Sequence, residues 1–223
     1  MSENEKPTSS EEQKDEIEKF GSVKTKGNIQ CISIVGEIEG HRLLGEQTKT
    51  TKYEHLLPQL AAAQDDDKTD GLLILLNTCG GDVEAGLAIA ELISGMSKPT
   101  VSLVLGGGHS IGVPLSVAAD YSLIAPSATM TLHPIRMTGL VIGVEQTFRY
   151  FEKMQEKIGE FVLKHSRISK AEFDRLMYDT DDMANDVGTI IFADRAVECG
   201  LIDEMGGLAR AFSKLYEMIG SKK

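Results

Sequence analysis

The sequence alternates between short runs that are almost wholly apolar and longer segments whose apolar residues recur every three or four positions. The apolar runs predict strands of a sheet that is covered on both faces, and the periodic segments predict helices. Expected strands are 29–35, 71–76, 100–105, 121–124, 129–132, 189–192 and, as a last strand or turn, 201–203. Expected helices are 53–64, 83–94, a segment after Ser110, 144–164, 169–178, 193–199 and 209–219.

Strand, glycine turn and helix follow one another about every 30 residues, which is typical of an α/β fold with right-handed crossover connections. This order predicts one domain over residues 28–223, which is long enough to bury a sizeable core. Residues 1–27 contain mostly charged and polar side chains, which cannot bury enough surface to offset the entropy of ordering. They predict a flexible charged N-terminal tail.

The charge and cysteine content of the chain restrict its partners and its location. A formal net charge of -11 at pH 7 argues against nucleic acid or an anionic membrane as the main partner. The sequence contains no apolar run near the roughly 20 residues of a transmembrane segment, and no signal-peptide core. Cys31, Cys79 and Cys199 cannot all pair within the chain, so they predict buried, reduced thiols. These features indicate a cytoplasmic protein.

Candidate chemistry begins at Ser110, which stands between three consecutive glycines, 106–108, and an expected buried helix. A serine at such a turn can act as a nucleophile when a base reaches its hydroxyl. The next apolar run ends at His133, which is the best candidate for that base. The structural alternatives are a serine that only caps the helix and a histidine that only packs in the core.

Residues 108–112 also match G-x-S-x-G, the nucleophile turn of α/β-hydrolases. That class places its acid between the serine and a final histidine. The only histidine beyond His133 is His165, in an expected helix, so this order is hard to satisfy. The order Ser110, His133 and then an acid from 179–186 is easier to satisfy.

Four stretches of the chain together resemble ClpP, the proteolytic subunit of Clp protease, which has the ClpP/crotonase fold. LLILLNTCGGDVEAGLAIAELIS resembles the family's strand, glycine-pair turn and helix, and VLGGGHSIGVPLSVAAD resembles the segment that carries the nucleophile. ATMTLHPI resembles the segment with the general-base histidine, and AVECGLIDEM resembles a segment close to the family's C-terminus. The resemblance implies an α/β fold of repeated ββα units, with 144–164 as a protruding handle helix.

The resemblance implies a serine endopeptidase that needs no cofactor and no metal. Ser110 would be the nucleophile and His133 the general base. The backbone N–H groups of Gly80 or Gly81 and of Ile111 would form the oxyanion hole, which stabilises the charge on the attacked carbonyl oxygen. Members of the family cleave peptides or unfolded proteins inside a chamber, so the resemblance also implies a homo-oligomeric ring.

The acid that would orient His133 does not follow directly from the resemblance. Counting back from AVECGLID without gaps puts Gly188 where the family has its aspartate. Asp186 lies two residues away, in an NDVGT segment that resembles a pattern within the family, and Asp181 and Asp182 are its rivals. Asp186 is therefore the expected third member of a Ser–His–Asp triad, although the acceptor need not be a carboxylate.

Three features depart from the family pattern. Thr78 and Cys79 replace Ser-Pro before the glycine pair, and His109 occupies a position that is usually small. The N-terminal tail does not resemble the family's ATPase-docking loop, so the resemblance does not extend to an ATPase unfoldase partner.

Three other readings stay open at this point. A Ser–Lys peptidase like the signal peptide peptidases would use Lys153 or Lys157 as the base, although His133 would then be unexplained. A crotonase-like acyl-CoA enzyme would use the Gly80 and Ile111 amides without a nucleophile, which leaves Ser110 unexplained. A catalytically silent structural or translocation-assisting factor would bind without cutting.

Overall fold

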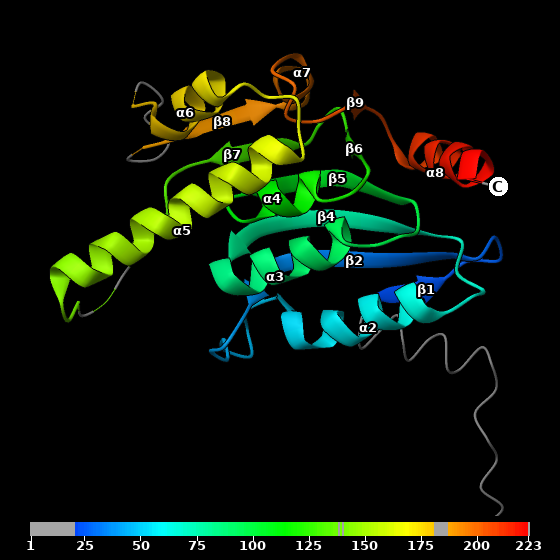
Figure 1. The fold of residues 1–223 in the computed structure, drawn as a ribbon, viewed down its shortest axis with the longest axis horizontal. Coiled ribbons are helices and arrows are strands. Elements are labelled where there is room, and N and C mark those ends of the chain that lie inside the picture. Colours follow the sequence, from blue (N-terminus) through cyan, green and yellow to red (C-terminus); the bar gives the residue numbers. More distant parts are fainter. Residues whose placement is uncertain (1–20, 138, 140, 181–186, 223) are drawn as a thin grey trace, which may run out of the picture.

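A computed structural model describes residues 21–137, 139, 141–180 and 187–222. Its centre is a twisted sheet in the order β1-β2-β4-β5-β6-β9, in which β2, β4, β5, β6 and β9 are parallel (Figure 1). β7 pairs with the end of β5, and β8 pairs antiparallel with β7. The strands are β1 Ser22–Lys24, β2 Ile29–Glu39, β3 Thr50–Lys52, β4 Gly71–Gly81, β5 Thr100–His109, β6 Tyr121–Ile124, β7 Thr129–Leu132, β8 Thr189–Phe192 and β9 Glu204–Met205.

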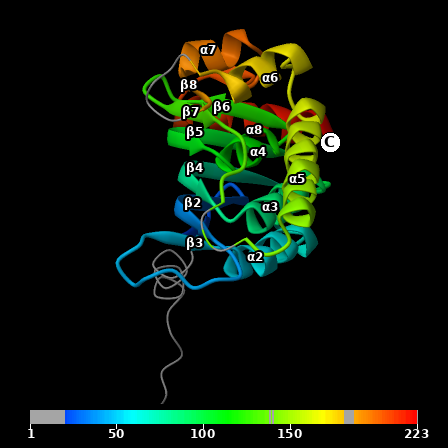
Figure 2. The same cartoon turned by 90° about the vertical axis from the view of Figure 1, so that its left-hand side faces the viewer.

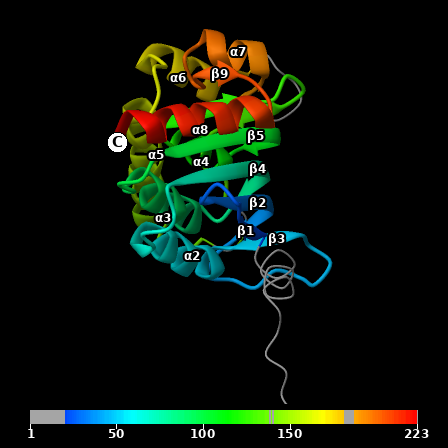
Figure 3. The ribbon, with the colours of Figure 1, turned by 90° about the vertical axis from the view of Figure 1, so that its right-hand side faces the viewer.

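Helices cover both faces of this sheet, as its apolar strands require. The helices are α2 Tyr53–Asp65, α3 Val83–Ser94, α4 Gly112–Val117, α5 Val144–Lys164, α6 Lys170–Tyr178, α7 Ala193–Glu198 and α8 Leu208–Lys222. Helices α2, α3, α4 and α5 lie on one side of the strands (Figure 2). Helix α8 packs along β4 and β5 (Figure 3), where Ala211 and Leu215 join a second apolar cluster with Leu73 and Leu103. The predicted α/β class is therefore confirmed.

The periodic segments begin and end close to their predicted positions. β2, β4 and β5 extend further than predicted, β6, β7 and β8 have the predicted bounds, and the last strand is Glu204–Met205 rather than 201–203. β4 and β5 continue past their apolar runs to Gly81 and His109, because glycine-rich backbone still pairs in the sheet. Residues 22–24, which the sequence places in the tail, pair antiparallel with β2 as β1. Val23 packs against the apolar cluster under α8. The charged residues around Val23 in the sequence give no sign of this contact. Residues 1–20 of the predicted tail lie outside the described residues.

The cysteines differ from the prediction at one position. Cys31 is buried in β2 and Cys199 is half-buried, and burial raises the pKa of both thiols. Cys79 is exposed, because alternate residues of β4 beyond Leu76 point away from the core. All three cysteines are free thiols.

The two halves of helix α5 differ in how far their apolar side chains are buried. Ile158, Phe161 and Val162 are buried in its second half, whereas Phe148 in its first half is 66% exposed. The first half extends beyond the strands, as Figure 1 shows. This geometry matches the protruding handle helix. Phe161 belongs to the protein's own core, whereas Phe148 does not.

Candidate active site

Ser110 lies at the turn between the end of β5 and the start of α4. Its φ is +58°, in the left-handed region, which costs a non-glycine residue roughly 1–3 kcal/mol and persists only where the surroundings enforce it. The Ser110 N–H donates to the Thr131 carbonyl at 2.9 Å. This bond ties the serine to β7, two residues before His133, because β5 changes partner from β6 to β7 along its length.

Gly80 brings the end of β4 directly against Ser110. A Cβ atom at Gly80 would lie 2.7 Å from the Ser110 Cβ and 3.2 Å from its Oγ, and the glycine has a φ of +97°. Any side chain at this position would push the serine away. The glycine pair thus allows two strand ends to meet at the serine hydroxyl.

The two glycines differ as oxyanion-hole donors. The Gly80 N–H donates to Thr78 Oγ1 at 3.0 Å, while that hydroxyl donates to the Gly36 carbonyl at 2.6 Å. Gly81 instead lines the same cavity as Ser110 and Ile111. Of the two alternatives, Gly80 is the glycine whose N–H already has an acceptor, and Gly81 is the one that lines the cavity together with Ile111.

Ser110 and His133 line one cavity of about 190 Å³. His133 reaches it because it directly follows β7, and Ser110 because it directly follows β5. The structure therefore brings together the two residues that the sequence predicted as nucleophile and base. The rest of the lining is largely apolar and comes mainly from α4, α5, α6 and the segment after His133: Val113, Ile135, Ile158, Val162, Phe173 and Met177.

The His133 imidazole is hydrogen-bonded to the main-chain carbonyl of the next residue. Its Nδ1 lies 2.7 Å from the Pro134 carbonyl oxygen. Because a carbonyl can only accept, this bond requires the proton on Nδ1, so that in the neutral imidazole the Nε2 lone pair is free. Within the described ranges no hydrogen bond links Ser110 Oγ to His133, and such catalytic bonds often form only once substrate is bound.

Gly188 occupies the position beside His133 at which the ungapped register predicts the family's aspartate. It has a φ of +108°, and a Cβ atom there would lie 2.3 Å from the Leu132 carbonyl oxygen and 2.6 Å from the His133 Cβ. This position therefore accepts only glycine. The candidate acids Asp181, Asp182 and Asp186 lie outside the described residues.

The two ends of the acidic segment meet close to His133. The Gly188 N–H donates to the Asp179 carbonyl at 2.8 Å, and the Asp179 carboxylate lies 3.4 Å from an Arg175 Nη1. Asp179 and Gly188 therefore lie next to each other, and Gly188 is in contact with the candidate base.

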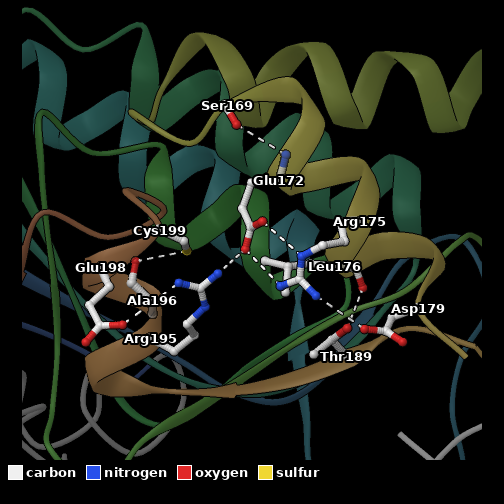
Figure 4. A network of polar contacts seen from close by, with 10 residues as sticks. All are labelled: Ser169, Glu172, Arg175, Leu176, Asp179, Thr189, Arg195, Ala196, Glu198 and Cys199. Atoms are coloured by element: carbon white, nitrogen blue, oxygen red, sulfur yellow. Dashed lines mark hydrogen bonds and ion pairs between the residues drawn. The ribbon is translucent and has the colours of Figure 1, made fainter. Parts of the chain in front are cut away.

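A polar network between α6 and α7 fixes the strand that follows Gly188 (Figure 4). Glu172 accepts from Arg175 and Arg195, and Arg175 is the main cause of the lowered pKa of the Glu172 carboxyl. The Thr189 hydroxyl donates to the Leu176 carbonyl at 2.8 Å. These contacts join α6, β8 and α7, and so stabilise Gly188 against His133.

Three other side chains, Lys153, Lys157 and His109, lie outside the cavity that contains Ser110. Lys153 and Lys157, the bases of the Ser–Lys reading, are exposed and do not line the cavity that contains Ser110. Lys157 instead borders a separate depression with Leu87 and Glu91. His109 is hydrogen-bonded through Nδ1 to Thr131 Oγ1 at 2.8 Å, and burial lowers its pKa. It is a local hydrogen-bonding residue and does not line the cavity.

Sequence reasoning missed Gln155, which lines the cavity from α5. A signal was present, because Gln155 falls at helical spacing between Phe151 and Ile158, on the apolar face of the helix. A polar residue on such a face needs a partner.

Two kinds of feature are absent from the part of the chain that the structure describes. No helix there is both long enough and apolar enough to span a membrane. No group of three or more histidine, cysteine, aspartate or glutamate side chains there is arranged to hold a metal ion.

Comparison with known proteins agrees with this geometry. A family model described as Clp protease matches residues 25–207. The chain is also 61% identical, over 194 residues, to the translocation-enhancing protein TepA of Halalkalibacterium halodurans. That alignment covers 87% of this chain and 76% of the relative.

Proposed function

Because this chain belongs to the Clp protease family, we propose that it is a serine endopeptidase with Ser110 as nucleophile and His133 as general base. The observation that carries the proposal is the single cavity lined by both residues at the ends of two neighbouring strands. The left-handed backbone of Ser110 and its close contact with Gly80 support a nucleophilic role, because a helix cap needs neither feature.

The residues of the site suffice for acyl transfer to water. His133 Nε2 takes the proton of the Ser110 hydroxyl as Oγ bonds to the peptide carbonyl carbon. The N–H groups of Gly81 and Ile111 would stabilise the oxyanion that forms. His133 then gives the proton to the leaving amine as the C–N bond breaks. A water, activated by the same nitrogen, hydrolyses the acyl-enzyme and restores Ser110.

Asp186 is proposed as the carboxylate that acts on His133 Nδ1. It is two residues from Gly188, so the chain keeps its Cα within about 8 Å of a residue that contacts His133. Gly188 itself carries no side chain, which leaves the role to a neighbouring acid. Asp181 and Asp182 stay its rivals, because they follow Asp179, whose carbonyl accepts the Gly188 N–H.

The Ser–His proposal and the Ser–Lys reading are separated by two substitutions. His133→Ala is expected to reduce hydrolysis of an unfolded protein such as labelled casein by about three orders of magnitude or more, because the serine loses its base. Lys157→Ala and Lys153→Ala are expected to stay within about twofold of wild type, because both side chains lie outside the cavity. An active His133→Ala protein together with an inactive lysine variant would overturn the assignment of the base.

A homo-oligomeric ring that encloses the sites is proposed from the family and from α5. Ile142, Val144 and Phe148 are 83%, 73% and 66% exposed at its projecting end, and exposed apolar side chains gathered in this way mark interfaces. The substrates proposed are peptides and unfolded proteins that can enter such a chamber. An ATPase unfoldase is not part of the proposal, and a cytoplasmic location rests on the free thiols.

Sedimentation velocity at micromolar concentration is expected to show an oligomer of six or more subunits, on the order of the rings that enclose a chamber. Phe148→Ser should shift the protein towards smaller species, because it removes exposed apolar area without touching the core. Lys153→Ser, on the same helix, serves as the control and should sediment like wild type. A wild-type monomer would contradict the chamber.

A second candidate function comes from the relative named translocation-enhancing protein TepA. Its name favours a role in which this chain assists protein translocation. The two candidates are compatible if the assistance requires cleavage. They diverge if the Ser110 variants support translocation as well as wild type does.

A further inference from the structure

Gln155 connects α5 to the segment that follows His133. Its Oε1 accepts the Ile135 N–H at 2.8 Å, and both residues are half-buried in the wall of the active-site cavity. Its Nε2 lies 3.9 Å from the Met177 sulfur of α6. The amide is thus held between two helices, with its oxygen directed at the main chain beside the candidate base.

The Ile135 N–H belongs to the same peptide group as the Pro134 carbonyl. That carbonyl lies 2.7 Å from His133 Nδ1, so one planar unit is bound at both ends. Gln155 binds its N–H and His133 binds its oxygen. Rotation of the peptide would break both bonds, so the glutamine fixes the direction in which the carbonyl points.

We propose that Gln155 is a positioning residue that sets the tautomer and orientation of the His133 imidazole through the Pro134–Ile135 peptide. With the carbonyl fixed, the proton is kept on Nδ1 and Nε2 is left able to accept the Ser110 proton. The catalytic consequence rests on the proposed peptidase function, whereas the tautomer is a property of the folded protein alone.

The role is separable from that of Asp186. One N–H can be shared between two acceptors, and a carbonyl and a carboxylate favour the same tautomer. Gln155 would therefore contribute whether His133 works in a triad or in a pair with Ser110.

The test compares Gln155→Met with Gln155→Glu. Methionine keeps the length of the side chain and removes the acceptor, while glutamate keeps an acceptor oxygen for the Ile135 N–H and removes the amide NH₂. Protein with ¹⁵N-labelled histidine is studied by NMR at a pH where His133 is neutral. The chain has five histidines, so His133→Asn identifies the resonance of interest.

Wild type and Gln155→Glu are expected to show the Nδ1-protonated tautomer, and Gln155→Met a mixture of the two tautomers. In peptide hydrolysis, Gln155→Met should lower kcat by about tenfold with KM within about twofold, as expected when one hydrogen bond that orients the base is lost. Gln155→Glu should recover most of that rate. A purely structural role for Gln155 would lower stability without changing the tautomer.

Either of two NMR results would overturn the proposal. A wild-type His133 protonated on Nε2 would do so without any variant, so the test does not depend on the folding of Gln155→Met. A single Nδ1-protonated tautomer in folded Gln155→Met would do the same. If wild-type protein hydrolyses no substrate, the proposed function fails, and the tautomer measurement still decides this inference.

Discussion

Replacement of Ser110 by alanine is expected to lower peptide hydrolysis by about a millionfold, to the level left when a nucleophile is removed from a serine peptidase. The fold should persist, because Ser110 is half-buried, and the hydroxyl is the only group lost. The turn keeps its glycines and the main-chain bond from residue 110 to Thr131. The measurement is hydrolysis of labelled casein, with circular dichroism and sedimentation on the same sample.

Ser110→Gly provides a matched control for the backbone. Glycine suits the left-handed conformation at this position and should stabilise the protein by up to about 1 kcal/mol, while it also lacks the hydroxyl. Both variants should be equally inactive. Full activity in either one would remove Ser110 from the mechanism, whatever the effect on stability.

The second large effect is expected at Asp186. If its carboxylate acts on His133 Nδ1, Asp186→Asn should lower kcat by roughly two to four orders of magnitude with little change in KM, because the amide NH₂ favours the wrong tautomer. Asp181→Asn and Asp182→Asn should stay within about threefold of wild type, since a carboxylate that does not contact His133 couples weakly to the site. Steady-state kinetics on preparations of equal oligomeric state make the comparison.

Two results would contradict the assignment of Asp186. An inactive Asp182→Asn beside an active Asp186→Asn would show that the register through the acidic segment is wrong. If all three variants remain active, the Pro134 carbonyl is a sufficient acceptor for His133, and the mechanism reduces to a Ser110–His133 pair.

Most of the architecture could be predicted because it follows from local periodicity. The 3.6-residue repeat of α5 and the unbroken apolar runs of β4 and β5 are each visible within a short window. β1 could not be predicted, because its pairing with β2 depends on a contact that its own three residues do not encode.

Part of the candidate site could also be predicted from the sequence, and part could not. Ser110 and His133 follow directly from a glycine turn and a strand end, and the β5–β7 pairing brings them to one cavity. The choice between Gly80 and Gly81 depends on the Thr78 hydroxyl, and the role of Gln155 depends on a bond to a peptide 20 residues away. A single sequence does not show which partner such a hydroxyl or side-chain amide binds.

The central claim, that Ser110 is an activated nucleophile, is tested most directly by labelling the native protein with a fluorophosphonate. This probe bonds to a serine oxygen only when a base has activated it, so it requires no knowledge of the substrate. Mass spectrometry of the digested protein is expected to place one adduct per chain on Ser110 in wild type and none in Ser110→Ala or His133→Ala. An unlabelled wild-type oligomer, or label that persists in Ser110→Ala, would contradict the account.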